Sequence, residues 1–431
     1  MNKRLPGLIK LILLIIAVSL IVGSAVALFL WLLTVAIHYR FKNTWLLYLL
    51  PLAGILIHLI YKTVGKSSEK GNNLIIDEIH QPGVGVPGLM APIILFTTII
   101  THLFGGSAGR EGTAVQIGGS IAYTFGKWFK INQKDTSILL ISGVAAGFGA
   151  VFGTPLTGAI FAIEVLALGK LEYGAALPAL LASLVGDWAV DAWQVHHTTY
   201  HIDALGVLTA SANLILISKV ILASAAFGLI GYVFAVGVHQ TKSIFLKIIK
   251  IEWLIPVLGG LTIIGFTYLS GKPDYLSLGV DAEYLGAVTI PSAFTSGGAD
   301  IWSWLWKTIY TIITLSTGFK GGEVTPLFYI GATLGNSLAV LLNSPVSLFA
   351  ALGFIAVFAG ATNTPLACTI MGTELFGSEH ILLFAIACFT AYLFSGHKSI
   401  YSSQRMDVLA GKNYIYQKIY KYKIKITTKK L

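Results

Sequence analysis

The stretch that decides the fold is GREGTAVQIGGS at residues 109–120, because the chain repeats its pattern as GGEVTPLFYIGA at residues 321–332. At an offset of 212 residues, the two stretches pair matching residue types: Glu111 with Glu323, Thr113 with Thr325, and Gly119 with Gly331. An acid and a threonine that recur at one spacing in Gly-rich, apolar sequence indicate two copies of one structural unit.

A second pair of stretches supports this interpretation. Thr154-Pro-Leu156 recurs as Thr364-Pro-Leu366 at an offset of 210 residues, and a glutamate follows nine residues after each proline, at Glu164 and Glu374. Two separate matches at almost one offset predict an internal repeat, although they leave open whether its copies run parallel or inverted. The expected division is a first half at 1–210, a second half at 211–405, and a basic tail without a regulatory domain at 406–431.

The composition places both halves in a membrane. Of the 431 residues, 55% are hydrophobic and 11% are charged, whereas soluble proteins carry about 25% charged residues. The apolar run from Leu8 to Ile37 exceeds the roughly 20 residues that cross a bilayer and is too long for the apolar core of a secretory signal. We therefore expect it to be a retained, tilted spanning helix.

Further apolar segments follow along the chain, near 45–62, 89–105, 137–151, 156–169, 174–191, 213–239, 253–270, 302–318, 326–343, 347–361 and 380–394. Several are shorter than a full span and are interrupted by glycine or proline, which is tolerated at membrane depth only where the backbone is buried or lines a cavity. The polar stretches between them are predicted to be connecting loops: 64–80, 192–203 and 271–300.

Basic residues gather at both ends of the chain, whose net charge is +10. Lys3 and Arg4 precede the first apolar run, and seven lysines lie between Lys412 and Leu431. Short basic flanks stay on the cytoplasmic side, so we expect a multi-pass protein of the cell membrane with both termini in the cytoplasm. We expect the tail to contact anionic lipid headgroups and not nucleic acid.

Four segments are candidates for an anion site: Gly83–Pro87, Gly109–Thr113, Gly318–Pro326 and Gly396–Tyr401. Three of them lead into an apolar helix, whose first N–H groups are free and carry about half a positive charge. Glycines let these N–H groups approach an ion, and helix N-termini that meet inside a membrane can hold an anion without a full cation. The alternative is that the glycines only allow close helix packing.

Glu111 and Glu323 are the candidate proton carriers. A carboxylate inside a bilayer costs several kcal/mol, so an acid there is functional by default. An ionised glutamate would occupy and block an anion site, whereas a protonated one would vacate it and carry a proton. The alternative is a structural ion pair with Arg110 or Lys320.

The remaining polar groups support weaker inferences. Glu164 and Glu374 could relay protons or cap buried backbone. His196, His197 and His201 could ligate a metal, but they lie in a polar loop without a partnering acid motif. We therefore expect no metal and no cofactor.

These motifs resemble those of one family, the CLC chloride channels and anion/proton antiporters. Its anion-coordinating motifs read GSGIP, GREGP or GKEGP, and GxFxP, with a pore tyrosine after them. They appear here in order as Gly83–Pro87, Gly109–Thr113, Gly322–Pro326 and Tyr401. The resemblance covers nearly the whole membrane domain. It implies an all-α polytopic fold with an inverted repeat of tilted, broken helices, a homodimer with one pore in each subunit, and a gating role for Glu111.

The same resemblance implies which residues bind the anion: Val84, Gly85, Val86, Gly109, Arg110, Glu111, Gly112, Thr113, Gly322, Glu323, Val324, Thr325 and Tyr401.

Departures from the family pattern point to one clade. Val84 replaces the serine of the first motif, Thr113 replaces the proline of the second, and Glu323 and Val324 replace an apolar residue and a phenylalanine in the third. Val165 stands where chloride/proton antiporters carry an inner proton-accepting glutamate. Together these departures resemble the bacterial fluoride/proton antiporters. A missing hydroxyl at position 84 weakens a site tuned to chloride, but the preference for fluoride is implied by the resemblance alone.

We therefore expect a secondary transporter that exports fluoride in exchange for protons, with Glu111 and Glu323 carrying the protons. Its expected partners are fluoride or chloride, protons, the lipid bilayer and a second copy of the chain. A CLC-type chloride/proton exchanger and a passive chloride channel remain alternatives. An intramembrane enzyme with these two acids as a catalytic pair is disfavoured because no nucleophile or metal set accompanies them. A non-transporting assembly subunit is disfavoured equally.

Overall fold

The structure is a computed structural model that describes residues 4–203 and 210–406, so Lys3 and the tail lysines lie outside the described residues. The described residues form fifteen α-helices and one pair of two-residue strands. The first half contains α1 (Arg4–Lys42), α2 (Leu50–Thr63), α3 (Asn72–His80), α4 (Met90–Leu103), α5 (Glu111–Trp128), α6 (Gln133–Phe152), α7 (Pro155–Glu164), β1 (Ala167–Leu168) and α8 (Ala176–Ala192). The second half contains α9 (Ala210–Ile248), α10 (Leu254–Ser270), α11 (Ser303–Ser316), α12 (Val324–Leu341), α13 (Val346–Thr362), α14 (Pro365–Phe376), α15 (Ile381–Phe394) and β2 (Arg405–Met406).

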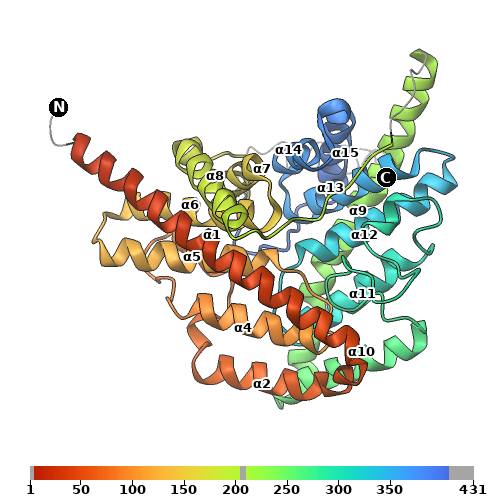
Figure 1. Cartoon of the computed structure of the whole chain (residues 1–431), viewed down its shortest axis with the longest axis horizontal. Coiled ribbons are helices and arrows are strands. Elements are labelled where there is room, and N and C mark those ends of the chain that lie inside the picture. The colour runs from red at the N-terminus through yellow and green to blue at the C-terminus, as the bar shows by residue number, and fades with distance from the viewer. Residues whose placement is uncertain (1–3, 204–209, 407–431) are drawn as a thin grey trace, which may run out of the picture.

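Helices α1 and α9 are the longest elements, with 39 residues each. At 1.5 Å per residue each is about 58 Å long, almost twice the roughly 30 Å of a bilayer's hydrocarbon core, so both must be tilted to lie within it. Figure 1 shows α1 running across the first half and α9 along the second. Six described stretches are long and apolar enough to cross a membrane, and the first of them begins at Gly7. The predicted helix at 8–38 is therefore confirmed.

The polar stretch at 64–80 was wrongly predicted to be only a connecting loop. Its second part is α3, which buries Leu74, Ile75 and Ile76. These apolar residues pack into the protein interior, and Gly71 provides the turn before the helix with a φ of +56°. Of the other two polar stretches, 271–300 contains no α-helix and 192–203 contains only the last residue of α8.

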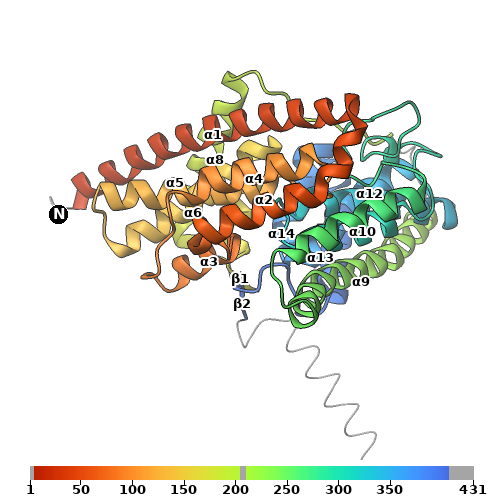
Figure 2. The ribbon, with the colours of Figure 1, turned by 90° about the horizontal axis from the view of Figure 1, so that it is seen from below.

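The two halves are inverted relative to each other. The Glu164 side chain at the end of α7 bonds to the N–H groups of Leu366 and Ala367 at the start of α14. The Glu374 side chain near the end of α14 bonds to the N–H groups at the start of α7. Since each helix's end lies at the other's beginning, α7 and α14 run antiparallel. Figure 2 shows the two halves side by side, with α1–α8 opposite α9–α15.

An aromatic cluster joins the halves beneath the point where α5 and α12 begin. The rings of Phe148 and Phe161 stack at 4.2 Å, Phe328 and Phe358 meet edge-on at 5.4 Å, and Phe148 lies 6.3 Å from Phe358. All four are buried. Such pairs add about 0.5–1.5 kcal/mol each beyond the area they bury. They therefore hold α6 and α7 of the first half against α12 and α13 of the second.

Candidate anion site

Two glycines join the beginnings of α5 and α12. The Gly109 N–H donates to the Gly322 carbonyl at 2.6 Å, and the Gly322 N–H donates to the Gly109 carbonyl at 2.7 Å, which forms an antiparallel bridge. A Cβ at Gly322 would lie 2.7 Å from the Gly112 nitrogen, and a Cβ at Gly109 would lie 2.9 Å from Cδ of Pro326. Only glycine fits this approach. The two copies of the repeated motif therefore meet, with their helix N-termini together.

The Glu111 side chain lies between these N-termini and is fully buried. Its Oε2 accepts from the Thr325 N–H at 3.0 Å and from the Arg110 N–H at 3.1 Å, and its Oε1 accepts from the Thr325 hydroxyl. The Arg110 Nε lies 3.7 Å from Oε1. Backbone N–H groups at helix starts, with a hydroxyl beside them, are donors suited to a small anion. Glu111 therefore occupies, with its own carboxylate, a set of donors suited to a small anion.

Glu323, which the sequence match pairs with Glu111, lies one position earlier relative to its helix: it precedes α12, whereas Glu111 is the first residue of α5. Oε2 of Glu323 is buried and accepts no hydrogen bond from the described residues. This oxygen lies 3.5 Å from the place of a Cβ at Gly112, and Nδ2 of Asn72 lies 3.0 Å from the same place. A buried carboxylate oxygen without a donor is costly unless it takes up a proton or a neighbour moves toward it. The two acids therefore differ in their hydrogen bonding at the site.

Asn72 is a site residue that the sequence analysis missed. It is the first residue of α3 and is buried, and its Oδ1 has no hydrogen-bond partner among the residues described. The next residue, Asn73, accepts from the Ser403 N–H at 2.9 Å, which ties α3 to the segment that follows Tyr401. Gly-Asn-Asn before an apolar triplet is a helix-start signal, and it could have revealed α3.

Glu111 separates two small cavities. One has a volume of about 20 Å³ and is lined by Arg110, Glu111, His197 and Tyr200, among others. The other, of about 10 Å³, is lined by residues that include Asn72, Val115 and Tyr401. Each has room for about one water molecule. Because Val115 lies one helical turn after Glu111, the first turn of α5 stands between the cavities.

Tyr401 reaches the second cavity from the end of the described chain. Its side chain is buried, and its ring meets Phe161 edge-on at 6.3 Å. The preceding N–H, from Ile400, donates to the Ala361 carbonyl at 3.0 Å. The structure thus brings the Gly109–Thr113, Gly322–Pro326 and Tyr401 segments to one region, as the sequence predicted for these three.

The Thr113 and Val324 side chains belong to the same two motifs as Glu111 and Thr325, but their contacts differ from those of Thr325. The Thr113 hydroxyl lies 2.7 Å from the Thr98 hydroxyl on α4, so this bond holds α4 against α5. Val324 is buried at the first position of α12. The two matching threonines, Thr113 and Thr325, therefore have different partners.

The Gly83–Pro87 segment lies elsewhere. The Ser120 hydroxyl donates to the Pro87 carbonyl at 2.7 Å, and a Cβ at Gly85 would lie 3.0 Å from the Tyr123 hydroxyl. Both contacts are on α5, which begins at Glu111, and at 1.5 Å per residue they lie about 13–18 Å along the helix from it. The structure does not bring Val84, Gly85 and Val86 to Glu111, contrary to the expected single point of convergence.

The physical reason is a carboxylate that the sequence analysis did not consider. Glu78 is buried, and its side chain accepts from the Gly83 N–H at 3.1 Å and from the Gly85 N–H at 2.7 Å. The N–H groups of this loop are therefore already bound within the protein. The Val84 side chain, at the tip of the loop, is 75% exposed.

Glu164 and Glu374 cap buried backbone, which was one of the two roles left open. The Glu164 carboxylate accepts N–H bonds of 3.0 and 2.7 Å from α14. The Glu374 carboxylate accepts N–H bonds of 2.8 Å from Leu156 and Thr157, and a 2.6 Å bond from the Thr157 hydroxyl. Val165, beside Glu164, is buried.

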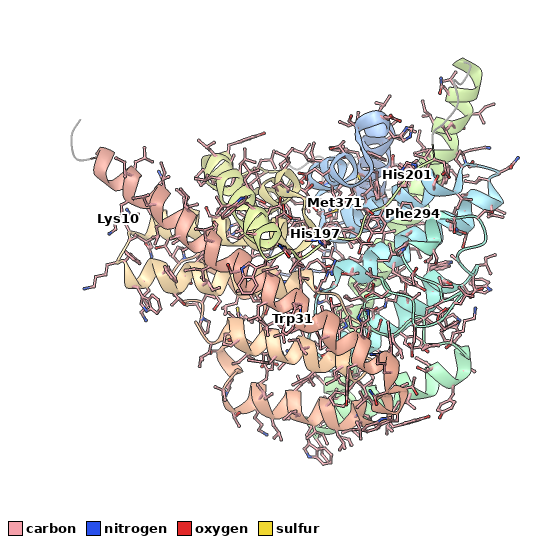
Figure 3. The ribbon with its side chains drawn as sticks, in the orientation of Figure 1. Lys10, Trp31, His197, His201, Phe294 and Met371 are labelled. Atoms are coloured by element: carbon pink, nitrogen blue, oxygen red, sulfur yellow. The ribbon has the colours of Figure 1, made fainter. Side chains whose placement is uncertain are left out.

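The histidines of the 192–203 segment are spread out. His196 and His201 are exposed, whereas His197 is partly buried and lines the cavity beside Glu111. Figure 3 shows His197 near the middle of the molecule and His201 farther along the same segment. No group of three or more His, Cys, Asp or Glu residues suited to a metal occurs in the described part of the chain.

Comparisons with known proteins agree with this geometry. A family model described as "Voltage gated chloride channel" matches residues 52–396. A protein of Pseudomonas syringae pv. tomato named "Chloride/fluoride channel protein" is 46% identical over 404 residues, which are 93% of this chain and 88% of that protein. The "H(+)/Cl(-) exchange transporter ClcA" of Vibrio cholerae is 25% identical over 352 residues, which are 74% of this chain and 73% of that protein.

Two solved structures have the same fold. A crystal structure of a CLC-type fluoride/proton antiporter has a TM-score of 0.87 and 34% identity, and the match covers 93% of this chain and 98% of that one. A slow cyanobacterial Cl⁻/H⁺ antiporter has a TM-score of 0.77 and 20% identity over 91% of this chain and 96% of that one, and it supports the fold alone. With a family model that spans most of the chain and a relative of 46% identity, this all-α polytopic protein with an inverted repeat belongs to the CLC family, the voltage gated chloride channel family.

Proposed function

We propose that this chain is a secondary transporter that exports fluoride across the cell membrane in exchange for protons. The observation that carries the proposal is the buried Glu111 carboxylate, which accepts hydrogen bonds from a helix start in each half. Two named similarities favour fluoride as the anion: the chloride/fluoride channel protein and the fluoride/proton antiporter structure.

The exchange follows from competition for one set of donors. While Glu111 is ionised, its carboxylate holds the Thr325 N–H and hydroxyl, so an anion cannot bind there. A proton on Glu111 removes its charge and weakens these bonds, because hydrogen bonds to a charged acceptor are roughly twice as strong as neutral ones. Glu111 then leaves with its proton, and fluoride accepts from the same groups. The two ions move in opposite senses because they exclude each other.

Glu323 is the second proton acceptor in this proposal. It is the only other acid that the repeat places at the bridge, and its Oε2 has no donor among the described residues. A proton leaving Glu111 could therefore be received without breaking an existing bond. The proposed anion-binding and transport residues are those that meet here: Gly109, Arg110, Glu111, Gly112, Thr113, Gly322, Glu323, Val324, Thr325 and Tyr401, with Asn72 added.

The assembly and orientation are part of the same proposal. We assign a homodimer with one site in each subunit, both termini in the cytoplasm, and halves that divide near residues 210 and 211, where α9 begins. The proposed activity is transport and not an enzymatic reaction, since the two acids are accompanied by a bridge of glycines and not by a nucleophile.

Chloride/proton exchange is the second candidate, because ClcA exchangers are 25% identical to this chain over most of its length. Against it stands Val165, a buried apolar residue where the resemblance expects an inner proton acceptor. A passive chloride channel is the third candidate, and it would need no proton movement.

Flux from proteoliposomes decides between these functions. Vesicles loaded with fluoride or chloride are diluted into anion-poor buffer, and external anion and external pH are recorded together. We expect fluoride efflux accompanied by proton uptake, and slower chloride efflux. Fluoride efflux without any proton movement would contradict the exchange, and chloride efflux faster than fluoride efflux would contradict the assigned anion.

A further inference from the structure

Lys307 is a buried cation outside the anion site. Its side chain, on α11, is fully buried. Its Nζ lies 2.7 Å from the Ser277 carbonyl, 3.2 Å from the Tyr275 carbonyl and 3.4 Å from the Leu276 carbonyl, and 5.2 Å from the centre of the Tyr329 ring. None of the ion pairs among residues 4–203 and 210–406 includes it.

These surroundings fit an ammonium group. An ammonium has three donors and no acceptor, and here three carbonyl oxygens and the face of an aromatic ring are directed toward it. A neutral amine would turn its lone pair toward one of these oxygens. The carbonyls solvate the charge but add no net negative charge, so the field of the ammonium extends into the protein.

The repeat shows that this position does not require a cation for folding. The structure relates these parts of the two halves at an offset of 213 residues, since Gly109 bridges Gly322 and α4 and α11 begin at Met90 and Ser303, so Lys307 corresponds to Ile94 on α4, which is buried. An apolar residue therefore packs well at the matching place in the first half. Because a buried cation is more costly than such a residue, its presence in the second half calls for a role beyond packing.

Two short connections link Lys307 to the anion site. Tyr329, whose ring it faces, lies one helical turn after Thr325 on α12, and Thr325 binds Glu111. The segment that supplies its carbonyl partners continues to Val280, which lines the cavity beside Glu111. These connections comprise two side-chain contacts and one turn of helix, which puts the ammonium on the order of 10–20 Å from the Glu111 carboxylate.

We propose that Lys307 is a positioning residue for the transported anion, whose buried positive charge attracts an anion to the donors of Thr325. The inference rests on the proposed function and adds a determinant of affinity to it. The ammonium acts at a distance, because its own donors are used by the carbonyls of residues 275–277. The same attraction acts on ionised Glu111, which uses the same donors.

The expected size of the effect is about tenfold in affinity, because two unit charges on the order of 10–20 Å apart interact by about 0.8–1.7 kcal/mol, or about 4- to 17-fold, at an effective dielectric constant of about 20. The charge is buried, so salt should screen the effect little.

The test compares Lys307→Met with Lys307→Arg in proteoliposomes, with Ile94→Met as the matched control in the first half. We expect Lys307→Met to raise the half-saturating fluoride concentration about tenfold, which is the size of the expected attraction, and to change the maximal rate much less. The pH dependence of transport should move to higher pH, because ionised Glu111 loses the same attraction. Lys307→Arg should restore both quantities, and Ile94→Met should alter neither.

The other titratable and charged groups near these two residues stay unchanged in all variants. Around Glu111 they are Arg110, His197, Tyr200, Glu323 and Tyr401, around Lys307 they are Arg40, Asp274, Tyr275, Glu283 and Tyr329, and His102 on α4 lies near both. A shift in the pH dependence therefore reports on Lys307. A purely structural role would lower thermal stability and leave the half-saturating concentration and the pH dependence in place.

Lys307→Gln, whose amide can still donate to the carbonyls, replaces the Met variant if that variant does not fold. A folded neutral variant with wild-type affinity and pH dependence would overturn the inference, and so would an Arg variant that restores stability but not affinity. If the wild-type protein itself moves no fluoride, the proposed function fails instead, so the two failures are distinguishable.

Discussion

Two pairs of repeat-related glutamates show how differently one inverted fold uses the same residue. Glu164 and Glu374 are bound symmetrically, because each carboxylate accepts N–H bonds from the start of the helix that carries the other. Glu111 and Glu323 are bound asymmetrically. Glu111 accepts three hydrogen bonds, whereas Oε2 of Glu323 accepts none from the described residues. The symmetric pair holds the halves together, and the asymmetric pair leaves one acid able to gain a partner.

The asymmetry extends to the residues around the acids. The Thr325 hydroxyl binds Glu111, whereas its counterpart Thr113 bonds to Thr98 on a neighbouring helix. Likewise Lys307 in the second half corresponds to Ile94 in the first. Where both halves keep the same contacts, the fold is being stabilised. Where they differ, an ion can be bound in a directional way, so the comparison supports the proposal that transport occurs at the bridge of Gly109 and Gly322.

Replacing Glu111 should have the largest effect. Glutamine keeps the shape of the side chain but cannot ionise, so Glu111→Gln should abolish proton movement coupled to fluoride in proteoliposomes. External pH recorded during fluoride efflux checks this outcome. The matched control is Glu374→Gln, the same chemical change in the symmetric pair, which should keep coupling. Proton uptake that persists in Glu111→Gln would contradict the assignment of the coupled proton to Glu111.

Glu323→Gln should impair coupled exchange less severely, by about tenfold, equivalent to about 1.4 kcal/mol in a rate-limiting barrier. The reason is that Glu323 receives the proton in the proposal, while Glu111 can still vacate the anion site. Fluoride efflux and proton uptake measured in the same vesicles should fall together. An undiminished proton flux in this variant would mean that Glu323 serves only to position neighbouring groups such as Asn72.

The symmetric pair should affect stability and not coupling. A glutamine amide can replace one acceptor but directs a donor at the second N–H, so Glu374→Gln and Glu164→Gln should each cost about 1.5–3 kcal/mol. Glu374 accepts three bonds and Glu164 two, so the Glu374 variant should have the lower thermal midpoint in detergent. Loss of proton coupling in Glu164→Gln, with a normal midpoint, would restore the relay role for Glu164.

The sequence predicted the repeat and its acids because both are local patterns. The match of Glu111 with Glu323 and of the two Thr-Pro-Leu stretches needs only residue types and spacing. It could not show that the halves are inverted, because a spacing along the chain carries no direction in space. The antiparallel arrangement became visible only in the contacts of α7 with α14.

The parts of the site that the sequence did not predict depend on side-chain partners far from any motif. The Gly83–Pro87 sequence fits an anion motif, but the N–H groups of Gly83 and Gly85 donate to Glu78. Glu78 precedes the motif and looks like an ordinary polar residue in the sequence. Asn72 lay in a stretch that we expected to be a loop, and its place at the site follows from the packing of α3 against α5.

The smallest effect is expected at Val84, and it tests the limits of the site. The sequence suggested that Val84→Ser would raise chloride transport relative to fluoride, since it restores the hydroxyl of the family motif. In the structure the side chain is 75% exposed, and its loop contacts α5 about 13–18 Å from Glu111. We therefore expect the ratio of chloride to fluoride efflux to change less than about twofold, because a single exposed substitution is worth about 0.5 kcal/mol or less.

Thr325→Val, which removes a hydroxyl that binds Glu111, is the contrasting variant and should alter fluoride efflux far more. If Val84→Ser instead shifted the ratio as strongly as Thr325→Val, the anion would have to pass the Gly83–Pro87 loop as well, and selectivity would not reside at the asymmetric bridge alone.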